Sequence, residues 1–126
     1  MKKLLSLIMV MGSINSCFAA EMTCPDPQLS QLKEGKIPFP WLKNPFSAYD
    51  PPVAELSSFI RANILVAGGI GRGVVCHYAF SKGTYSIWWQ GNVKIPAPTN
   101  TNWLSSLGGF ECPAVRVSDC IFNAAM

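Results

Sequence analysis

The sequence predicts a small domain that is all-β or β-rich: an antiparallel meander with a C-terminal hairpin, a proline-rich N-terminal arm and two disulfides. Three observations predict it. β-Branched and aromatic residues alternate with polar residues between positions 59 and 91, as in half-buried strands. Ten prolines and ten glycines in 126 residues disfavour a helical bundle. Four cysteines remain after an N-terminal export signal, which suits two disulfides in a small exported domain.

Length and composition limit the function as well as the fold. A chain of 126 residues holds one domain. Hydrophobic residues make up 49% of it and charged residues 13%, which excludes disorder over its whole length. The formal net charge of +3 is too small for a nucleic-acid-binding protein that relies on a strong basic field. We therefore expect no nucleic-acid partner.

Residues 1–19 are predicted to be a signal peptide. Lys2 and Lys3 precede an apolar stretch that is too short to span a membrane. Signal peptidase requires small side chains three residues and one residue before the cut, and cleavage after Ala19 places Cys17 and Ala19 there. The sequence therefore predicts export to the periplasm or the medium.

A lipid anchor is the alternative use of the same segment. In a lipoprotein signal, Cys17 would be acylated and would become the first residue, but Asn15 is unusual at its position in such a signal. We therefore expect the mature chain to start at Ala20. Removal of Lys2 and Lys3 with the signal lowers the formal net charge from +3 to +1, so charge predicts no acidic partner.

Residues 20–52 form the proline-rich arm. Seven prolines between positions 24 and 52 nearly exclude a regular helix or a central strand there. The arm is nevertheless rich in large apolar residues, and we expect it to pack on the body of the domain and bury them: Ile37, Phe39, Trp41, Leu42, Phe46 and Tyr49. The alternative is that the arm is an exposed proline-rich ligand for another protein.

Residues 53–126 are predicted to be an antiparallel β domain. Three strands are expected at 59–67, 72–80 and 84–90, with turns at 68–71 and 81–83. In the first strand the even positions are apolar and should face the core: Ile60, Ala62, Ile64 and Val66. The third strand can continue through 92–95 until prolines end it.

The last part of the chain is predicted to close the sheet. Residues 103–108 suit one helical turn, with Asn102 and Gly108 as its caps, and a short strand is the alternative. Residues 109–122 are predicted to be the closing hairpin. In this hairpin, Phe110 and Cys112 of the first strand are expected to face Cys120 and Phe122 of the second strand.

The four cysteines left after the signal are expected to pair. Cys112 and Cys120 are separated by only seven residues, with a proline to start a turn, which favours a bond between them. Cys24–Cys76 then follows by elimination. A zinc site is the alternative, but the spacing contains no Cys-x-x-Cys pair. We expect no metal and no cofactor.

Three short motifs resemble a known family. They are Cys-Pro-Asp-Pro at 24–27, Phe-Ile-Arg-Ala at 59–62 and Cys-His-Tyr at 76–78. Together they resemble a family of small exported bacterial proteins known only as a domain of unknown function. The resemblance covers most of the mature chain and implies an exported, disulfide-bonded, mostly β domain. It implies no activity and no catalytic residue.

An enzyme is not favoured by the residues themselves. A serine hydrolase would need His77, the single histidine, together with a serine such as Ser81 or Ser86 and a carboxylate such as Asp119. No Gly-x-Ser-x-Gly motif is present, and the carboxylates are scattered along the chain. The glycine-rich stretch 68–73 lacks the Lys-Ser/Thr of a phosphate loop, so we interpret it as a hairpin turn. Arg72 in this turn could meet an anionic partner.

The aromatic residues are the best candidates for a binding site. Trp88 and Trp89 are neighbours on a strand, so they must point to opposite faces of the sheet. Trp88 is expected beside His77 of the adjoining strand, away from Tyr85 and Trp89.

The predicted function is that of an exported, non-enzymatic binding or interaction protein of a bacterium, with a protein or glycan partner. In a pathogen, export would also allow it to act on the host, as a virulence factor. The alternative is a carbohydrate-binding module in which an exposed tryptophan and Tyr85 or Tyr78 form a flat platform for a sugar ring. A small secreted hydrolase is the less favoured third class.

Overall fold

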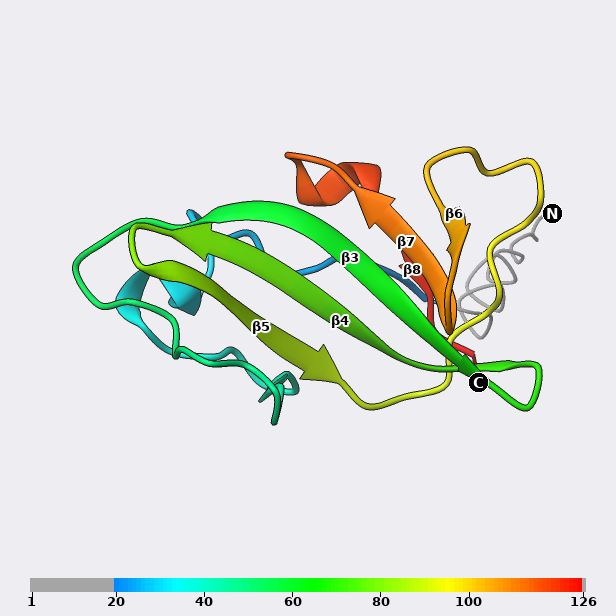
Figure 1. Cartoon of the computed structure of the whole chain (residues 1–126), viewed down its shortest axis with the longest axis horizontal. Coiled ribbons are helices and arrows are strands. Elements are labelled where there is room, and N and C mark those ends of the chain that lie inside the picture. Colours follow the sequence, from blue (N-terminus) through cyan, green and yellow to red (C-terminus); the bar gives the residue numbers. More distant parts are fainter. Residues whose placement is uncertain (1–19, 126) are drawn as a thin grey trace, which may run out of the picture.

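The computed structural model describes residues 20–125 and confirms the β-rich, antiparallel fold. Six strands form one sheet (Figure 1), and a two-stranded sheet pairs β1 with β8. The order in the large sheet is β2 (Leu42–Lys43), β5 (Gly83–Trp89), β4 (Ile70–Phe80), β3 (Ser58–Ala67), β7 (Gly109–Pro113) and β6 (Leu104–Ser106). The small sheet contains β1 (Glu21–Met22) and β8 (Phe122–Asn123), and two 3₁₀ helices complete the elements, η2 (Gln31–Glu34) and η3 (Val117–Asp119).

The central meander β3–β4–β5 follows the predicted strands closely. Ala62 and Ile64 are buried as expected, and Val66 packs against the core. The prediction for Ile60 is wrong, because the register shifts between Phe59 and Arg61 and leaves Ile60 without a partner on β4. A bulge of this kind changes which residues face the core. Phe59 is buried in place of Ile60.

The proline-rich arm contributes an edge strand as well as core residues. β2 pairs with β5, and the buried Trp41 just before β2 lies edge-on to Phe122 at 6.3 Å. The expectation that every large apolar residue of the arm is buried is wrong. Phe39 is 95% exposed and Phe46 is 93% exposed, and Leu42 and Tyr49 are exposed as well. Phe39 lies in a turn before the edge strand and Phe46 in one after it, so neither can reach the core on the inner face.

The C-terminal part differs from the prediction in its pairing. Residues 104–106 form a strand instead of a helical turn, so the C-terminal hairpin is β6–β7. β7 does not pair with the chain that follows it, because β3 takes one of its edges over five residue pairs and β6 takes the other. β8 then crosses to β1 at the other end of the chain. Val93 bridges Gly71 and Ala124 and does not extend β5.

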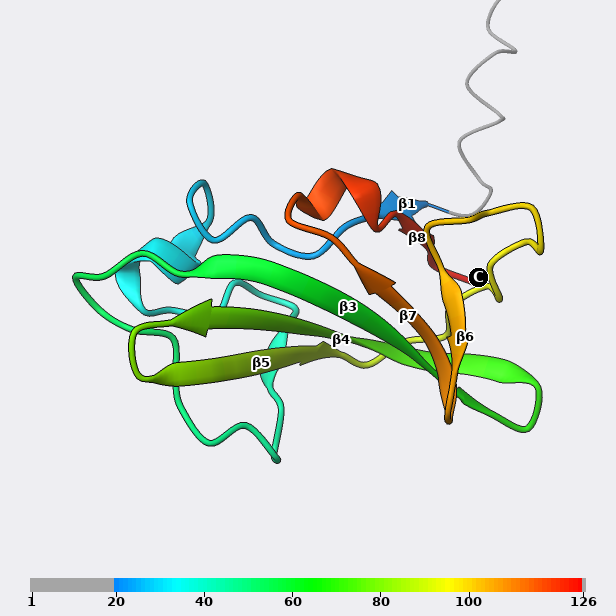
Figure 2. The same ribbon diagram turned by 45° about the horizontal axis from the view of Figure 1, so that its top comes forward.

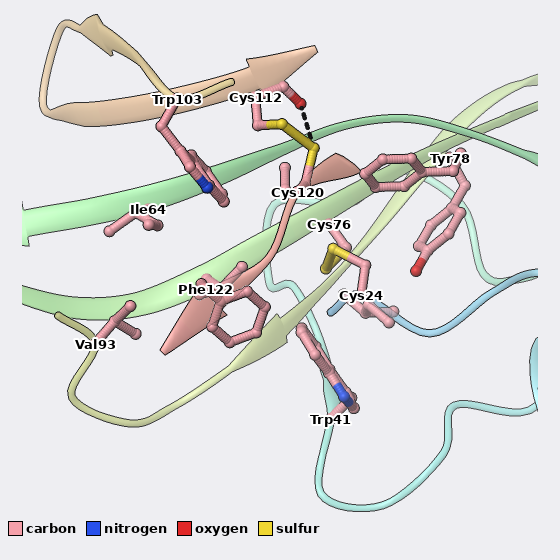
Figure 3. Packing of buried hydrophobic residues seen from close by; sticks show 14 of the residues in the cluster. Cys24, Trp41, Ile64, Cys76, Tyr78, Val93, Trp103, Cys112, Cys120 and Phe122 are labelled. Atoms are coloured by element: carbon pink, nitrogen blue, oxygen red, sulfur yellow. Dashed lines mark hydrogen bonds between the residues drawn. A yellow bond between two sulfur atoms is a disulfide. The ribbon is translucent and has the colours of Figure 1, made fainter. Parts of the chain in front are cut away.

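The core lies between one face of the large sheet and a second layer. Figure 2 shows β1, β8 and η3 above this inner face, together with the N-terminal segment. The main buried side chains come from both ends of the chain and from the sheet (Figure 3): Trp41, Ile64, Tyr78, Val93, Trp103 and Phe122, with all four cysteines of the domain. This second layer covers the inner face of the sheet and not the outer face.

Both predicted disulfides are confirmed. Cys24 bonds to Cys76 and ties the arm to β4, with the two Cα atoms 5.9 Å apart. Cys112 bonds to Cys120 across a separation of eight residues. The zinc alternative is wrong, because all four sulfur atoms are in disulfide bonds. Within residues 20–125 no helix is long and apolar enough to cross a membrane. The predicted signal peptide and the alternative lipid site at Cys17 lie outside the described residues.

Candidate functional site

An apolar groove of about 350 Å³ lies on the outer face of the sheet, opposite the core. Two turns form its walls: the residues after β2 and the turn between β6 and β7. Figure 2 shows both projecting beyond the sheet on the side away from β1 and β8. The lining residues are Asn44, Pro45 and Phe46 from the first wall, Ser106 to Gly109 from the second, and Asn63, Ile64, Leu65, Val75, His77 and Trp88 from the sheet.

Two rows of side chains across the strands make the floor of this groove. Asn63, Val75 and Trp88 lie opposite one another on β3, β4 and β5. In the next row His77 of β4 lies opposite Ser86 of β5. This places Trp88 and His77 on one face, as the alternation of the strands predicts.

Trp88 lies closely on the backbone of β4. A Cβ added to Gly73 would come within 2.6 Å of the indole Nε1 of Trp88, so only glycine leaves room for the ring. The Nε1 atom is buried and has no hydrogen-bond partner among residues 20–125. A buried N–H without an acceptor costs free energy, so this placement of the indole is not optimal for stability.

His77 is half-buried on the floor of the groove. Burial disfavours the charged imidazolium and is the main reason why the pKa of His77 is lowered to about 4. The positive charge of Arg61, which lies opposite it on β3, lowers this pKa further. His77 is therefore neutral at pH 7, and its imidazole can both donate and accept a hydrogen bond.

The rims of the groove are exposed apolar side chains on fixed turns. Phe46 forms one rim, and the fully exposed Leu107 forms the other. The turn of Phe46 is fastened to β5, because the Asn44 amide donates to the Ser86 hydroxyl at 2.8 Å and the Ser86 backbone N–H donates to the Ser47 hydroxyl at 3.0 Å. These two hydrogen bonds hold this wall of the groove against the sheet.

The other residues predicted for binding lie elsewhere. Tyr85 is buried on the inner face, stacked on Tyr78 with ring centroids 5.0 Å apart, and its hydroxyl hydrogen-bonds to Ser57 at 2.7 Å. Trp89 also faces inward and packs against Phe122. The prediction of an exposed sugar-binding platform that includes Tyr85 or Tyr78 is therefore wrong, because both rings are buried.

Arg72 is exposed next to the β3–β4 turn and donates a long hydrogen bond of 3.4 Å to the Ala67 carbonyl. It is not among the lining residues of the groove.

The residues considered for a hydrolase are not assembled into a triad. Asp119 pairs with Arg116 at 3.2 Å beside η3. The Ser81 backbone N–H donates to Glu55, and the Ser86 hydroxyl accepts from Asn44. No aspartate or glutamate is among the residues that line the groove in the described part of the chain. Between residues 20 and 125 no three His, Cys, Asp or Glu side chains form a group that could hold a metal ion.

Sequence reasoning missed both rims and one floor residue. The sequence predicts that Phe46 is buried and that Leu107 lies in a helical turn or a short strand. It does not single out Asn63. The signal that could have found Leu107 is its position directly before Gly108 and Gly109, since an apolar residue at the tip of a tight turn is exposed.

Comparison with known proteins gives no relative: no family model matches, and neither a curated protein nor a solved structure does. The resemblance to the uncharacterised exported bacterial family therefore stays a prediction.

Exchange of Trp88 for phenylalanine is expected to cost less free energy of unfolding than the same change at Trp103, because the N–H removed at Trp88 has no partner among residues 20–125. Trp103→Phe is the matched control, since the Trp103 indole donates to the Ile121 carbonyl at 2.8 Å. The control should lose about 1 kcal/mol more than Trp88→Phe, measured by urea unfolding. A larger loss for Trp88→Phe would mean that the indole N–H is satisfied in solution.

Proposed function

We propose that this protein is an exported, non-enzymatic interaction protein that receives an apolar side chain of a protein partner in its outer groove. One observation carries the proposal: the groove is mainly apolar, and its two rims are large apolar side chains that the domain leaves uncovered. Protein interfaces concentrate their binding energy in such apolar pockets with exposed anchors around them.

The rims favour a protein partner over a small molecule. A small ligand inside the groove would leave most of the Phe46 and Leu107 side chains in water, because both project from the walls. A partner surface laid over the groove would bury both side chains and the floor together. Burial of this apolar area would supply the main part of the binding free energy.

The buried disulfides support the export that this proposal includes. Cysteines pair in the periplasm and outside the cell, and stay reduced in most cytosols. Both bonds lie in the core, where a reductant has little access. In a pathogen, release from the cell would bring the groove to host proteins.

A glycan is a weaker candidate for the same groove. Sugar rings stack on flat, exposed indoles flanked by hydrogen-bonding side chains. Trp88 is only partly exposed and lies on Gly73, and most of the groove surface around it is apolar. The geometry therefore favours an apolar guest.

The proposal is tested by selecting a phage-displayed random peptide library on the folded protein. Peptides that bind are expected to lose about tenfold or more in affinity on Leu107→Glu, which places a charge at the rim. Val115→Glu is the matched control, because Val115 is 84% exposed and lies outside the groove. Peptides that bind Leu107→Glu as well as they bind the unchanged protein, or a selection that yields none, would contradict the proposal.

A further inference from the structure

Two polar side chains line the floor of the groove, and Asn44 and Ser106 are the polar residues of its walls. Asn63 and His77 lie on neighbouring strands and on the same face, two residues apart in register. Such diagonal neighbours are typically about 7–8 Å apart, so one oxygen atom between them can reach both side chains. Within residues 20–125 neither side chain makes a hydrogen bond to another protein group, and both are free for a guest.

The lining of the groove contains no charged side chain in the described part of the chain. Its titratable member, His77, is neutral at pH 7. Arg61 and Glu111 are the charged residues in the same cross-strand rows, and neither lines the groove. A charged group placed there would lose part of its hydration, and the lining has no charged side chain to pair with it, which is unfavourable.

The remaining walls suit a ring. Trp88, His77 and Phe46 present aromatic surfaces, and Leu107 and Val75 present aliphatic ones. Aromatic rings pack well against other rings and bury a large area at a small cost in side-chain entropy. A volume of about 350 Å³ is at the small end of ligand pockets, so the guest is a single ring system.

We propose that the side chain received by the groove is the phenol of a tyrosine on the partner protein, with its hydroxyl between Asn63 and His77. The inference rests on the proposed function and adds the identity of the anchor residue. A phenol is neutral at pH 7, and its hydroxyl can donate to one of the two floor side chains and accept from the other.

The test uses three capped amino acids as probes: N-acetyl-tyrosine amide, N-acetyl-phenylalanine amide and N-acetyl-phosphotyrosine amide. Each is titrated into the ¹⁵N-labelled protein, and the shifts of the Asn63, Val75 and Trp88 amides are followed. The tyrosine probe should bind about fivefold more tightly than the phenylalanine probe, because the hydroxyl gains a hydrogen bond. The phosphotyrosine probe should cause no shift at these residues.

Asn63→Leu keeps the size of the side chain and removes its polar atoms. It should abolish the preference for tyrosine over phenylalanine and leave phenylalanine binding intact. The control is Asn100→Leu, which changes an exposed asparagine outside the groove and should leave the preference unchanged.

Equal affinity for tyrosine and phenylalanine, binding of phosphotyrosine, or an unchanged preference in Asn63→Leu would each overturn the inference. No shift at these residues with any probe would overturn it as well. The proposed function would survive all of these results if selected peptides still require Leu107. Loss of that requirement would remove both.

Discussion

Removal of the Cys24–Cys76 disulfide by the double substitution Cys24→Ala and Cys76→Ala is expected to lower the free energy of unfolding by about 4 kcal/mol. The bond closes a long loop, because its two cysteines have a sequence separation of 52, so its loss increases the conformational entropy of the unfolded chain more than loss of the other bond. The arm also loses its covalent link to β4. For a domain of this size the melting temperature should fall by about 15 °C or more.

The second disulfide is the matched control. Cys112→Ala with Cys120→Ala opens a ring closed over a separation of only eight residues, for which the same entropy argument gives about 2.5 kcal/mol. Both double variants are unfolded with urea under non-reducing conditions. An equal loss in the two would show that loop length does not set the stabilisation, and that the strand pairing of β2 holds the arm.

The substitution Gly109→Ala is expected to destabilise the fold by about 3 kcal/mol. Gly109 begins β7, where it pairs with Leu65 of β3, and an added Cβ would overlap the carbonyl oxygen of Ile64. The obstacle is a backbone atom in a central strand and cannot rotate away. The β7–β3 ladder would have to shift, and the wall of the groove at Leu107 would shift with it.

Gly108→Ala is the control for this effect at the neighbouring position. A Cβ added to Gly108 meets no atom within 4 Å, and the substitution carries only the cost of a φ of +84° for alanine, about 1 kcal/mol. Thermal unfolding and the amide shifts of the groove residues compare the two variants. Similar losses of stability in the two variants would mean that β7 can shift to accommodate the added methyl group without further destabilisation.

The strands of the meander were predictable because their signal is local. Alternation between residues 59 and 90 fixes which side chains share a face, so Trp88 and His77 could be placed together before any contact was known. The bulge at Ile60 was not predictable, because it depends on how β3 and β4 pair. Nothing in the residues near Ile60 marks it.

The walls of the groove depend on contacts between distant segments. Both Trp41 and Phe46 are large and apolar, so the sequence predicts that both are buried. The pairing of β2 with β5 places Trp41 in the core and leaves Phe46 exposed. The strand that pairs with β8 could not be predicted either. Nearness in sequence favoured β7, but β8 pairs with β1 at the other end of the described chain. Local patterns therefore predicted the floor of the site, and long-range pairing determined its rims.

The pairing of β1 with β8 has a consequence for how the molecule can be presented. The backbone N–H of Ala124 donates to the Ala20 carbonyl at 3.0 Å, so both ends of the described chain leave from the same place. That place belongs to the layer above the inner face of the sheet (Figure 2), whereas the residues that line the groove lie on the outer face. A surface, label or fused protein attached through either terminus would therefore hold the domain with its groove turned outward, toward whatever approaches.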